Sequence, residues 1–262
     1  MNINVTGALT YCYTNNREID PQKDSVVFVH GAGMDHTVWT QSCRYFARHG
    51  RNVIAVDLPG HGRSAGAALT SIEESSDWLV QLLDVLQIPR AAIAGHSLGS
   101  LVALDCAARH PTRVRAIALV AGTAPMPVSQ AILDAAADND HAAFDMLTQW
   151  GYSKRHQYGG NINPGMWMVG STLRLLERCR PGVLHSDMSA CNNYQAGLER
   201  ASAIKCPVLM VLGREDRLTP VRATGPLRSA LPSPDVRVLE GAGHTLMVEA
   251  PNALLDALHT VL

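Results

Sequence analysis

The sequence predicts an α/β protein built on a mostly parallel central sheet. Short apolar runs of β-forming residues alternate with helical patterns along most of the 262 residues, and this alternation is typical of parallel sheets with helices on both faces. Several of the runs end in glycine-rich or polar stretches, at the sheet edge where such proteins place their active sites. Between about residues 124 and 200 the pattern is helical without a convincing strand, which indicates an insertion.

Composition narrows the class of protein further. Hydrophobic residues make up 47% of the chain, enough for a large core, and the net charge of −1 with no basic patch argues against a nucleic-acid partner. No apolar run is long enough to span a membrane, and no signal-peptide pattern opens the chain. The six cysteines are scattered without a C-x-x-C pair, so we expect reduced thiols in a cytoplasmic protein.

Residues 1–86 contain the patterns of a hairpin, two strands and two helices. We expect, in order, a short edge hairpin at residues 3–13, a buried strand Ser25–Val29, a helix Thr37–His49, a strand Asn52–Val56 and a helix ending near Leu86. Ser71 and Glu74 have the spacing of a capping box, so we expect that last helix to begin there.

From Ala91 onwards the strand–helix alternation continues, and it returns after the insertion. We expect a strand from Ala91, a helix to Arg109, a strand Val114–Val120, helices within Ser129–Ala137, Ala142–Trp150, Met166–Arg178 and His185–Arg200, a loop Tyr158–Gly165, and then a strand Val208–Leu212, a helix Pro220–Ala230, a strand Val236–Leu239 and a helix Asn252–Leu262. This assigns residues 1–123 and 201–262 to one core and residues 124–200 to a helical cap.

The sharpest chemical signal is Gly95-His96-Ser97-Leu98-Gly99. It lies between a predicted buried strand and a helical pattern, the context of the G-x-S-x-G nucleophile elbow. In such a turn the residues two before and two after the serine come close together, so glycine is needed at both positions. The serine hydroxyl is pushed out of the packed layers, and the following helix directs its free N–H groups at the reacting centre.

Partners for Ser97 follow two later strands. Asp216 lies just beyond the strand Val208–Leu212 and is our candidate acid, with Glu215 as the alternative. His244 lies in a glycine-flanked loop after the last strand, where it could reach Ser97. Its ordinary pKa near 6.5 suits a general base at neutral pH. For the other histidines near strand ends we expect structural or hydrogen-bonding roles: His30, His36, His61 and His96.

Taken together, these stretches resemble the α/β-hydrolase-fold enzymes that carry a helical cap. The resemblance rests on His30-Gly31-Ala32-Gly33, Asp57-Leu58-Pro59-Gly60-His61-Gly62-Arg63-Ser64, Gly95–Gly99, Gly213–Pro220 and Gly243-His244, in that order along the chain. It implies that Ser97 is the nucleophile, His244 the general base and Asp216 its orienting acid. It also implies an oxyanion hole formed by the backbone N–H groups of Ala32 and Leu98.

These features predict a serine hydrolase that cleaves a carboxylic ester of a small to medium hydrophobic substrate. A C–C bond hydrolase, a thioesterase or a lactonase would use the same triad, and a perhydrolase side activity stays open. A serine at the elbow argues against dehalogenases and epoxide hydrolases, which need a carboxylate there. A ligand receptor that retains the triad without turnover is the alternative from outside the enzymes.

Large apolar residues near the predicted site are candidates for contact with the substrate. They are Met34 and Trp39 near the glycine loop, and Met126, Trp150, Met166 and Trp167 in the cap. Each could equally pack against the core. No metal-ligand spacing and no dinucleotide-binding fingerprint occurs, so we expect a small-molecule substrate and no cofactor. The sequence does not determine the natural substrate or the oligomeric state.

Overall fold

The computed structural model describes residues 1–161 and 166–262, and its strands form one sheet. Eight strands lie in the order β1-β2-β4-β3-β5-β6-β7-β8. Their bounds are β1 Asn2–Val5, β2 Ala8–Tyr13, β3 Ser25–Val29, β4 Asn52–Val56, β5 Ala91–His96, β6 Val114–Val120, β7 Val208–Gly213 and β8 Asp235–Leu239. The predicted alternation and the mostly parallel sheet are therefore confirmed.

Most of the sheet is parallel, and its antiparallel part lies at one edge. β1 and β2 form the predicted hairpin, and β2 pairs antiparallel with β4. From β4 to β8 every neighbouring pair is parallel. The carboxyl ends of β3, β4, β5, β7 and β8 consequently meet at one sheet edge, and the motifs that follow these strands are brought together there.

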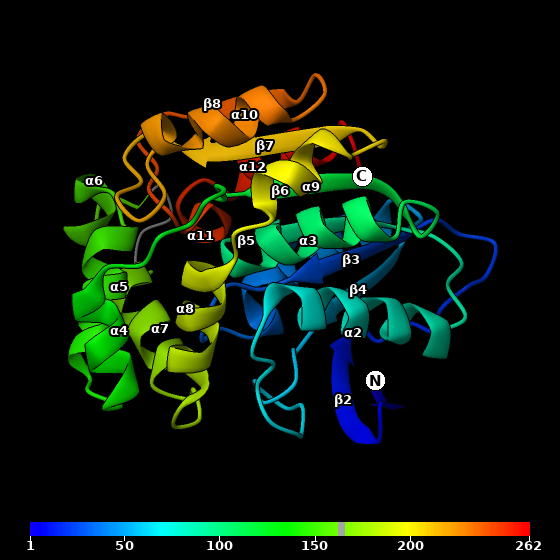
Figure 1. The fold of residues 1–262 in the computed structure, drawn as a ribbon, viewed down its shortest axis with the longest axis horizontal. Coiled ribbons are helices and arrows are strands. Elements are labelled where there is room, and N and C mark those ends of the chain that lie inside the picture. Colours follow the sequence, from blue (N-terminus) through cyan, green and yellow to red (C-terminus); the bar gives the residue numbers. More distant parts are fainter. Residues whose placement is uncertain (162–165) are drawn as a thin grey trace.

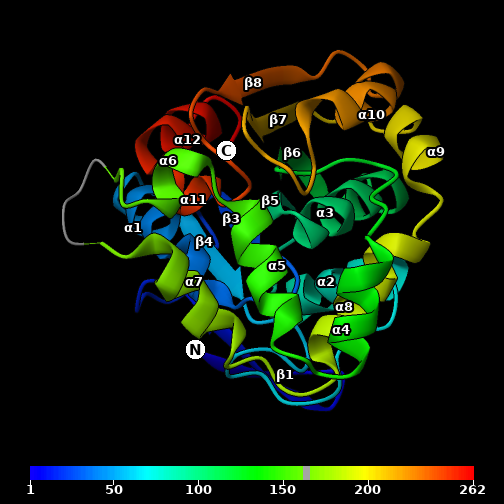
Figure 2. The same cartoon turned by 90° about the vertical axis from the view of Figure 1, so that its left-hand side faces the viewer.

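Helices cover both faces of this sheet (Figure 2). Helices α1 and α12 pack on one face, and α2, α3 and α10 pack on the other (Figures 1 and 2). Their bounds are α1 Thr40–Arg48, α2 Ile72–Val85, α3 Leu98–Arg109, α10 Gly225–Ala230 and α12 Pro251–Leu258, with short helices η1 His36–Trp39, η2 Val221–Thr224 and α11 Leu246–Glu249. Each helical layer closes its own buried apolar cluster against the sheet.

Only one of the two hydrogen bonds of the capping box predicted for α2 forms. The Ser71 hydroxyl accepts the Glu74 N–H at 3.1 Å, as expected. The Glu74 carboxylate, however, accepts the N–H of Thr70 at 2.9 Å, one residue before the cap. The helix therefore begins at Ile72, where the pattern placed it.

Among the described residues, six helices lie between β6 and β7. They are α4 Gln130–Ala137, α5 Ala142–Gly151, α6 Lys154–Gln157, α7 Met168–Leu176, α8 Val183–Asn193 and α9 Gly197–Ser202. Helices α4 to α8, which we call the cap helices, gather at one end of the molecule (Figure 1). Helix α9 instead lies against α3, so the long helical pattern His185–Arg200 divides between the cap and the core. The predicted loop Tyr158–Gly165 lies partly outside the described residues.

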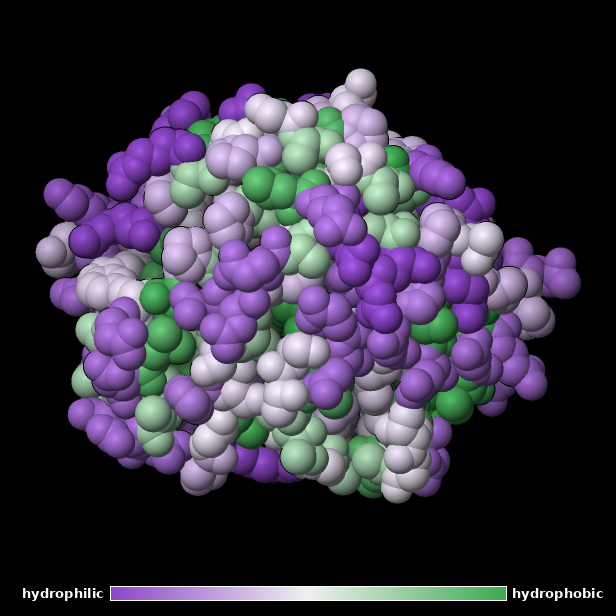
Figure 3. All heavy atoms as spheres, in the orientation of Figure 1, coloured by the Kyte–Doolittle hydropathy of each residue, from purple (hydrophilic) through white to green (hydrophobic). Residues whose placement is uncertain are grey.

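Within the described ranges, no helix combines the length and apolarity needed to cross a membrane. On the face drawn in Figure 3, hydrophobic residues are scattered among hydrophilic ones. That face therefore offers no broad apolar surface.

Candidate active site

Ser97 lies in the sharp turn between β5 and α3. Its φ of 53° and ψ of −115° are a backbone conformation that side-chain-bearing residues rarely adopt. The turn is held by the Ser97 N–H, which donates to the Val120 carbonyl at 2.9 Å. A Cβ atom at Gly95 would collide with the backbone of Gly99, and one at Gly99 would collide with the Val29 carbonyl. These contacts support the steric reason for the G-x-S-x-G pattern.

Asp216 and His244 meet beside this turn. His244 Nδ1 lies 2.8 Å from Asp216 Oδ2, while the exposed Glu215 accepts the Lys154 N–H instead. Burial alone would raise the pKa of Asp216. The charge and hydrogen bond of His244, with hydrogen bonds from Thr219, outweigh burial and hold that pKa below its usual value. Asp216 is thus kept as a carboxylate that fixes the imidazole with its Nδ1–H towards the acid.

His96 supports the backbone of His244. Its Nε2 lies 3.0 Å from the His244 carbonyl oxygen, which can only accept, so Nε2 carries the proton. Burial, and then the neighbouring His244, lower the pKa of His96 to about 3. His96 is therefore a neutral hydrogen-bond donor, and the expected structural role for this histidine fits its surroundings.

Ser97 and His244 face a common cavity together with Ala32. Among the described residues no hydrogen bond joins the Ser97 hydroxyl to His244, and such catalytic contacts are often long before substrate binds. The N–H groups of Ala32 and Leu98 likewise donate to no other group in the described part of the chain. Ala32 lines the same cavity as Ser97, and Leu98 follows Ser97 in the chain. An oxyanion hole requires two such unused N–H donors near the nucleophile.

The cavity has a volume of about 240 Å³, and apolar side chains form most of its wall. Three of the proposed substrate contacts, Met34, Met126 and Trp150, line it. Further lining residues come from the cap helices: Ile132, Leu147, Thr172, Leu176, Met188 and Cys191. Arg217, next to the candidate acid, also reaches the wall. This exposed side chain makes no ion pair or hydrogen bond within the described residues.

The other three proposed substrate contacts lie elsewhere. Trp39 is fully buried in the layer between the sheet and α1, where its indole N–H donates to the Val29 carbonyl at 3.1 Å. Met166 and Trp167 are 46% and 69% exposed, just before α7, and are not among the described residues that line the cavity. These three residues lie close in sequence to the glycine loop or within the insertion, but they do not line the described cavity.

Glu249, in α11, is a site residue that the sequence reasoning missed. Its buried carboxylate accepts the N–H groups of Gly243 at 2.9 Å and Thr245 at 3.2 Å, the two neighbours of His244. It also accepts the Ser153 N–H at 3.0 Å and lies 3.0 Å from His156 Nδ1. The sequence did offer one signal for Glu249, its place in an apolar run after Leu246 and Met247. An acid buried in such a run needs hydrogen-bonding partners.

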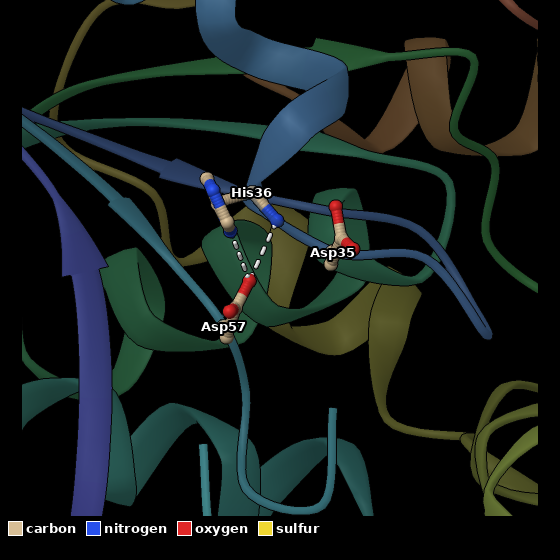
Figure 4. A group of neighbouring side chains, drawn as sticks. All are labelled: Asp35, His36 and Asp57. Atoms are coloured by element: carbon tan, nitrogen blue, oxygen red, sulfur yellow. Dashed lines mark hydrogen bonds and ion pairs between the residues drawn. The ribbon is translucent and has the colours of Figure 1, made fainter. Parts of the chain in front are cut away.

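Asp35, His36 and Asp57 form the one group of metal-binding residue types found in the described structure, with ligand atoms within 4.8 Å of one another. Figure 4 shows His36 turned towards Asp57, with Asp35 to one side. Both the N–H and Nδ1 of His36 lie 2.7 Å from Asp57 Oδ1, while Asp35 pairs with Arg178 at 2.8 Å. The carboxylates thus already accept protein hydrogen bonds, which fits a structural role for this group.

Comparison with known proteins adds evidence from outside the chain. Residues 26–257 match the model of the alpha/beta hydrolase family. A pimeloyl-[acyl-carrier protein] methyl ester esterase of Neisseria meningitidis is 34% identical over 205 residues, which cover 73% of this chain and 75% of that protein. An (E)-2-((N-methylformamido)methylene)succinate hydrolase of Acinetobacter baylyi is 22% identical over 241 residues, covering 90% of this chain and 89% of that protein.

The fold comparison agrees with the sequence comparison. The crystal structure of an enol-lactonase from Burkholderia xenovorans superposes with a TM-score of 0.86 at 20% identity, covering 100% of this chain and 99% of that one. At that identity the likeness concerns the fold alone.

Proposed function

This chain belongs to the alpha/beta hydrolase family, and we propose that it is a serine hydrolase that cleaves carboxylic esters through an acyl-enzyme. The observation that carries the proposal is the strained Ser97 turn opening into the cavity that His244, paired with Asp216, also lines. In this proposal Ser97 is the nucleophile, His244 the general base and Asp216 the residue that orients and stabilises the imidazole.

Acylation begins when His244 takes the proton from the Ser97 hydroxyl as the oxygen attacks the ester carbonyl. The negative charge that develops on the carbonyl oxygen is stabilised by the N–H groups of Ala32 and Leu98. His244 then gives its proton to the departing alkoxide, and the alcohol leaves. Water, activated by the same histidine, attacks the acyl-enzyme carbonyl. The carboxylic acid leaves, and His244 returns the proton to the Ser97 oxygen.

The cavity supports a preference for a moderately hydrophobic acyl or alcohol group. Met126 and Trp150 present apolar surface to it, and burying such a group stabilises the complex by about 25 cal/mol per Å². The similar proteins named above are an ester esterase, a substituted succinate hydrolase and an enol-lactonase. Thioesters, lactones and C–C cleavage substrates therefore belong in the same screen as carboxylic esters.

A serine-directed fluorophosphonate tests the assignment directly. We expect it to label Ser97 alone and to abolish hydrolysis of a chromogenic acetyl ester. The Ser97→Ala variant should stay folded, bind the ester and lose nearly all turnover. Labelling at another serine, or a fully active Ser97→Ala variant, would refute the nucleophile, and binding without turnover by the wild type would favour a receptor.

A further inference from the structure

We propose that Asp187, on cap helix α8, is a positioning residue for the oxyanion hole, because its buried pair with His61 holds the loop that carries Ala32. The inference rests on the serine hydrolase mechanism proposed above. It assigns to the cap a part in forming the catalytic machinery, in addition to lining the substrate cavity.

One carboxylate oxygen makes both contacts. Asp187 Oδ2 accepts the Gly33 N–H at 2.8 Å and lies 2.8 Å from His61 Nε2. The side chains of Asp187 and His61 are only 4% and 2% exposed. Gly33 directly follows Ala32, and Leu184 of the same helix packs against Gly33 at the place where a side chain would be. Helix α8 therefore fixes the backbone next to the proposed oxyanion donor.

The hydrogen-bond pattern requires two protons on His61. Nδ1 lies 2.9 Å from the Pro59 carbonyl, which can only accept. If Nε2 carried no proton, its lone pair would face a carboxylate that already accepts the Gly33 N–H. Burial would lower the pKa of His61, but the charge and hydrogen bond of Asp187, with the Pro59 carbonyl, outweigh burial and raise it. The contacts and the direction of this pKa shift thus both favour an imidazolium–carboxylate pair.

Other charged groups near His61 are compatible with this state. His30 packs on the His61 ring at 4.8 Å between centroids, and burial lowers the pKa of His30 to about 4, so it stays neutral. The negative charge of Asp57 favours the imidazolium. The adjoining polar cavity is lined, besides His61, by the titratable or charged residues Asp35, His36, Arg63, Arg178 and Cys179. Burial raises the pKa of Cys179 to about 12, so the thiol is neutral.

The pair makes the oxyanion loop sensitive to pH on the alkaline side. Because the pKa of His61 is raised above its ordinary value, the pair is complete below about pH 6.5 and is lost as the pH rises through the raised pKa. Loss of the proton leaves the Nε2 lone pair facing Asp187 and loosens the hold on Gly33. We expect kcat to fall on the alkaline side, while KM changes little because other residues form the acyl cavity.

Asp187→Asn tests the idea, because an amide oxygen can accept both hydrogen bonds but carries no charge to hold the imidazolium. If its oxygen faces Gly33, the His61 imidazolium loses its counter-charge, and if its nitrogen does, two donors face each other. We expect kcat on a chromogenic acetyl ester at pH 7 to fall by about ten-fold, and the alkaline limb of the rate profile to move to lower pH. Asp187→Glu, which keeps the charge, should retain the limb near its wild-type position.

Tyr194→Phe is the matched control. The Tyr194 hydroxyl, just after α8, donates to Asp105 of α3 at 2.9 Å, so its removal breaks one buried contact between the same segment and the core without touching the oxyanion loop. We expect its pH profile to match that of the wild type. If the alkaline limb of Tyr194→Phe moved as far as that of Asp187→Asn, any loosening of this segment would be enough to shift it. That result would overturn the positioning role of Asp187.

Amide hydrogen exchange gives a readout that does not depend on turnover. In Asp187→Asn the Gly33 amide should exchange faster than in the wild type and in Tyr194→Phe. A wild-type protein without ester turnover would refute the proposed function, while the exchange would still test the hold on Gly33. Unchanged exchange together with an unchanged pH profile would refute the role of Asp187.

If Asp187→Asn does not fold, the proposal can still be tested on the wild-type protein. Nuclear magnetic resonance titration of the His61 ring should give a pKa above the ordinary value, coinciding with the alkaline limb of the rate. A pKa at or below about 6.5 would overturn the proposal.

Discussion

Glu249→Gln is the sharpest test of how the loop that carries His244 is held. The Glu249 carboxylate is fully buried and accepts five hydrogen bonds. Three of them, from Gly243, Ser153 and His156, converge on Oε2. An amide could keep those three only by turning its NH₂ group towards Thr245, whose hydroxyl can rotate to accept but whose N–H cannot.

The number of hydrogen bonds lost determines how much Glu249→Gln destabilises the protein. One buried N–H without a partner costs about 1–3 kcal/mol, and the remaining bonds lose the extra strength of a charged acceptor. We expect a total loss of about 2–4 kcal/mol in the free energy of unfolding. For a chain of this size that corresponds to a fall in Tm of about 5–15 °C. Because His244 lies between two of the tethered residues, kcat should also fall by about ten-fold, with a smaller change in KM.

Glu240→Gln is the control for this experiment. Glu240 lies in the same loop but is exposed, and its pair with Arg214 at 2.9 Å is on the surface, where such a pair contributes under about 1 kcal/mol. Thermal unfolding and steady-state rates on an acetyl ester should separate the two variants. If Glu249→Gln unfolds at the same temperature as Glu240→Gln, this account of the buried carboxylate is wrong.

Three further predictions concern the triad and the cavity. Asp216→Asn should lower kcat by about 10⁴, as in the analogous protease substitution, while Glu215→Gln should be mild; reversed effects in steady-state kinetics would contradict the choice of acid. Trp150→Ala should lower the ratio of kcat/KM for long over short acyl esters, and the exposed Trp167→Ala should leave it unchanged; identical ratios would make Trp150 a packing residue. Arg217→Ala should lower kcat/KM for an ester whose acyl group ends in a carboxylate by about five-fold relative to a neutral ester, since an ion pair with the exposed guanidinium contributes about 1 kcal/mol; equal loss on both esters would rule out charge recognition.

The strands and the elbow could be predicted because their signals are local. Ser25–Val29, Asn52–Val56 and Val114–Val120 begin and end where the apolar runs do. Fully buried parallel strands are short apolar runs bounded by turns, so their ends are visible in the sequence. The turn at Ser97 needs glycine on both sides for a steric reason, and that too can be read from a few residues.

The direction of a side chain was harder to predict. Trp39 follows the glycine loop by only a few residues, yet η1 directs its ring under the sheet, away from the cavity. Met126 and Trp150 line the cavity while Trp167 is exposed, although all belong to the same helical insertion. The orientation of each depends on how the cap helices pack on the core, which no local pattern in the insertion specifies.

Asp187 had a signal that helical spacing could have revealed. It lies between Leu184 and Cys191 on the buried stripe of α8, where an acid without a partner would be costly. The identity of that partner could not be predicted, because His61 is 126 residues away in sequence. Acids on apolar helix stripes thus indicate where long-range contacts form, and the fold determines with what.

Two of the buried acid–histidine pairs join the cap helices to the core, one with its acid in the cap and the other with its acid in the core. In one, Asp187 belongs to the cap and His61 to the core, and in the other His156 of α6 belongs to the cap and Glu249 to the core. Buried pairs of this kind often add little net stability compared with apolar packing, while removal of one partner is costly. We expect these pairs to help specify one position for the cap helices on the core. Each pair also holds a backbone N–H of a loop at the candidate site, Gly33 in one case and Gly243 in the other.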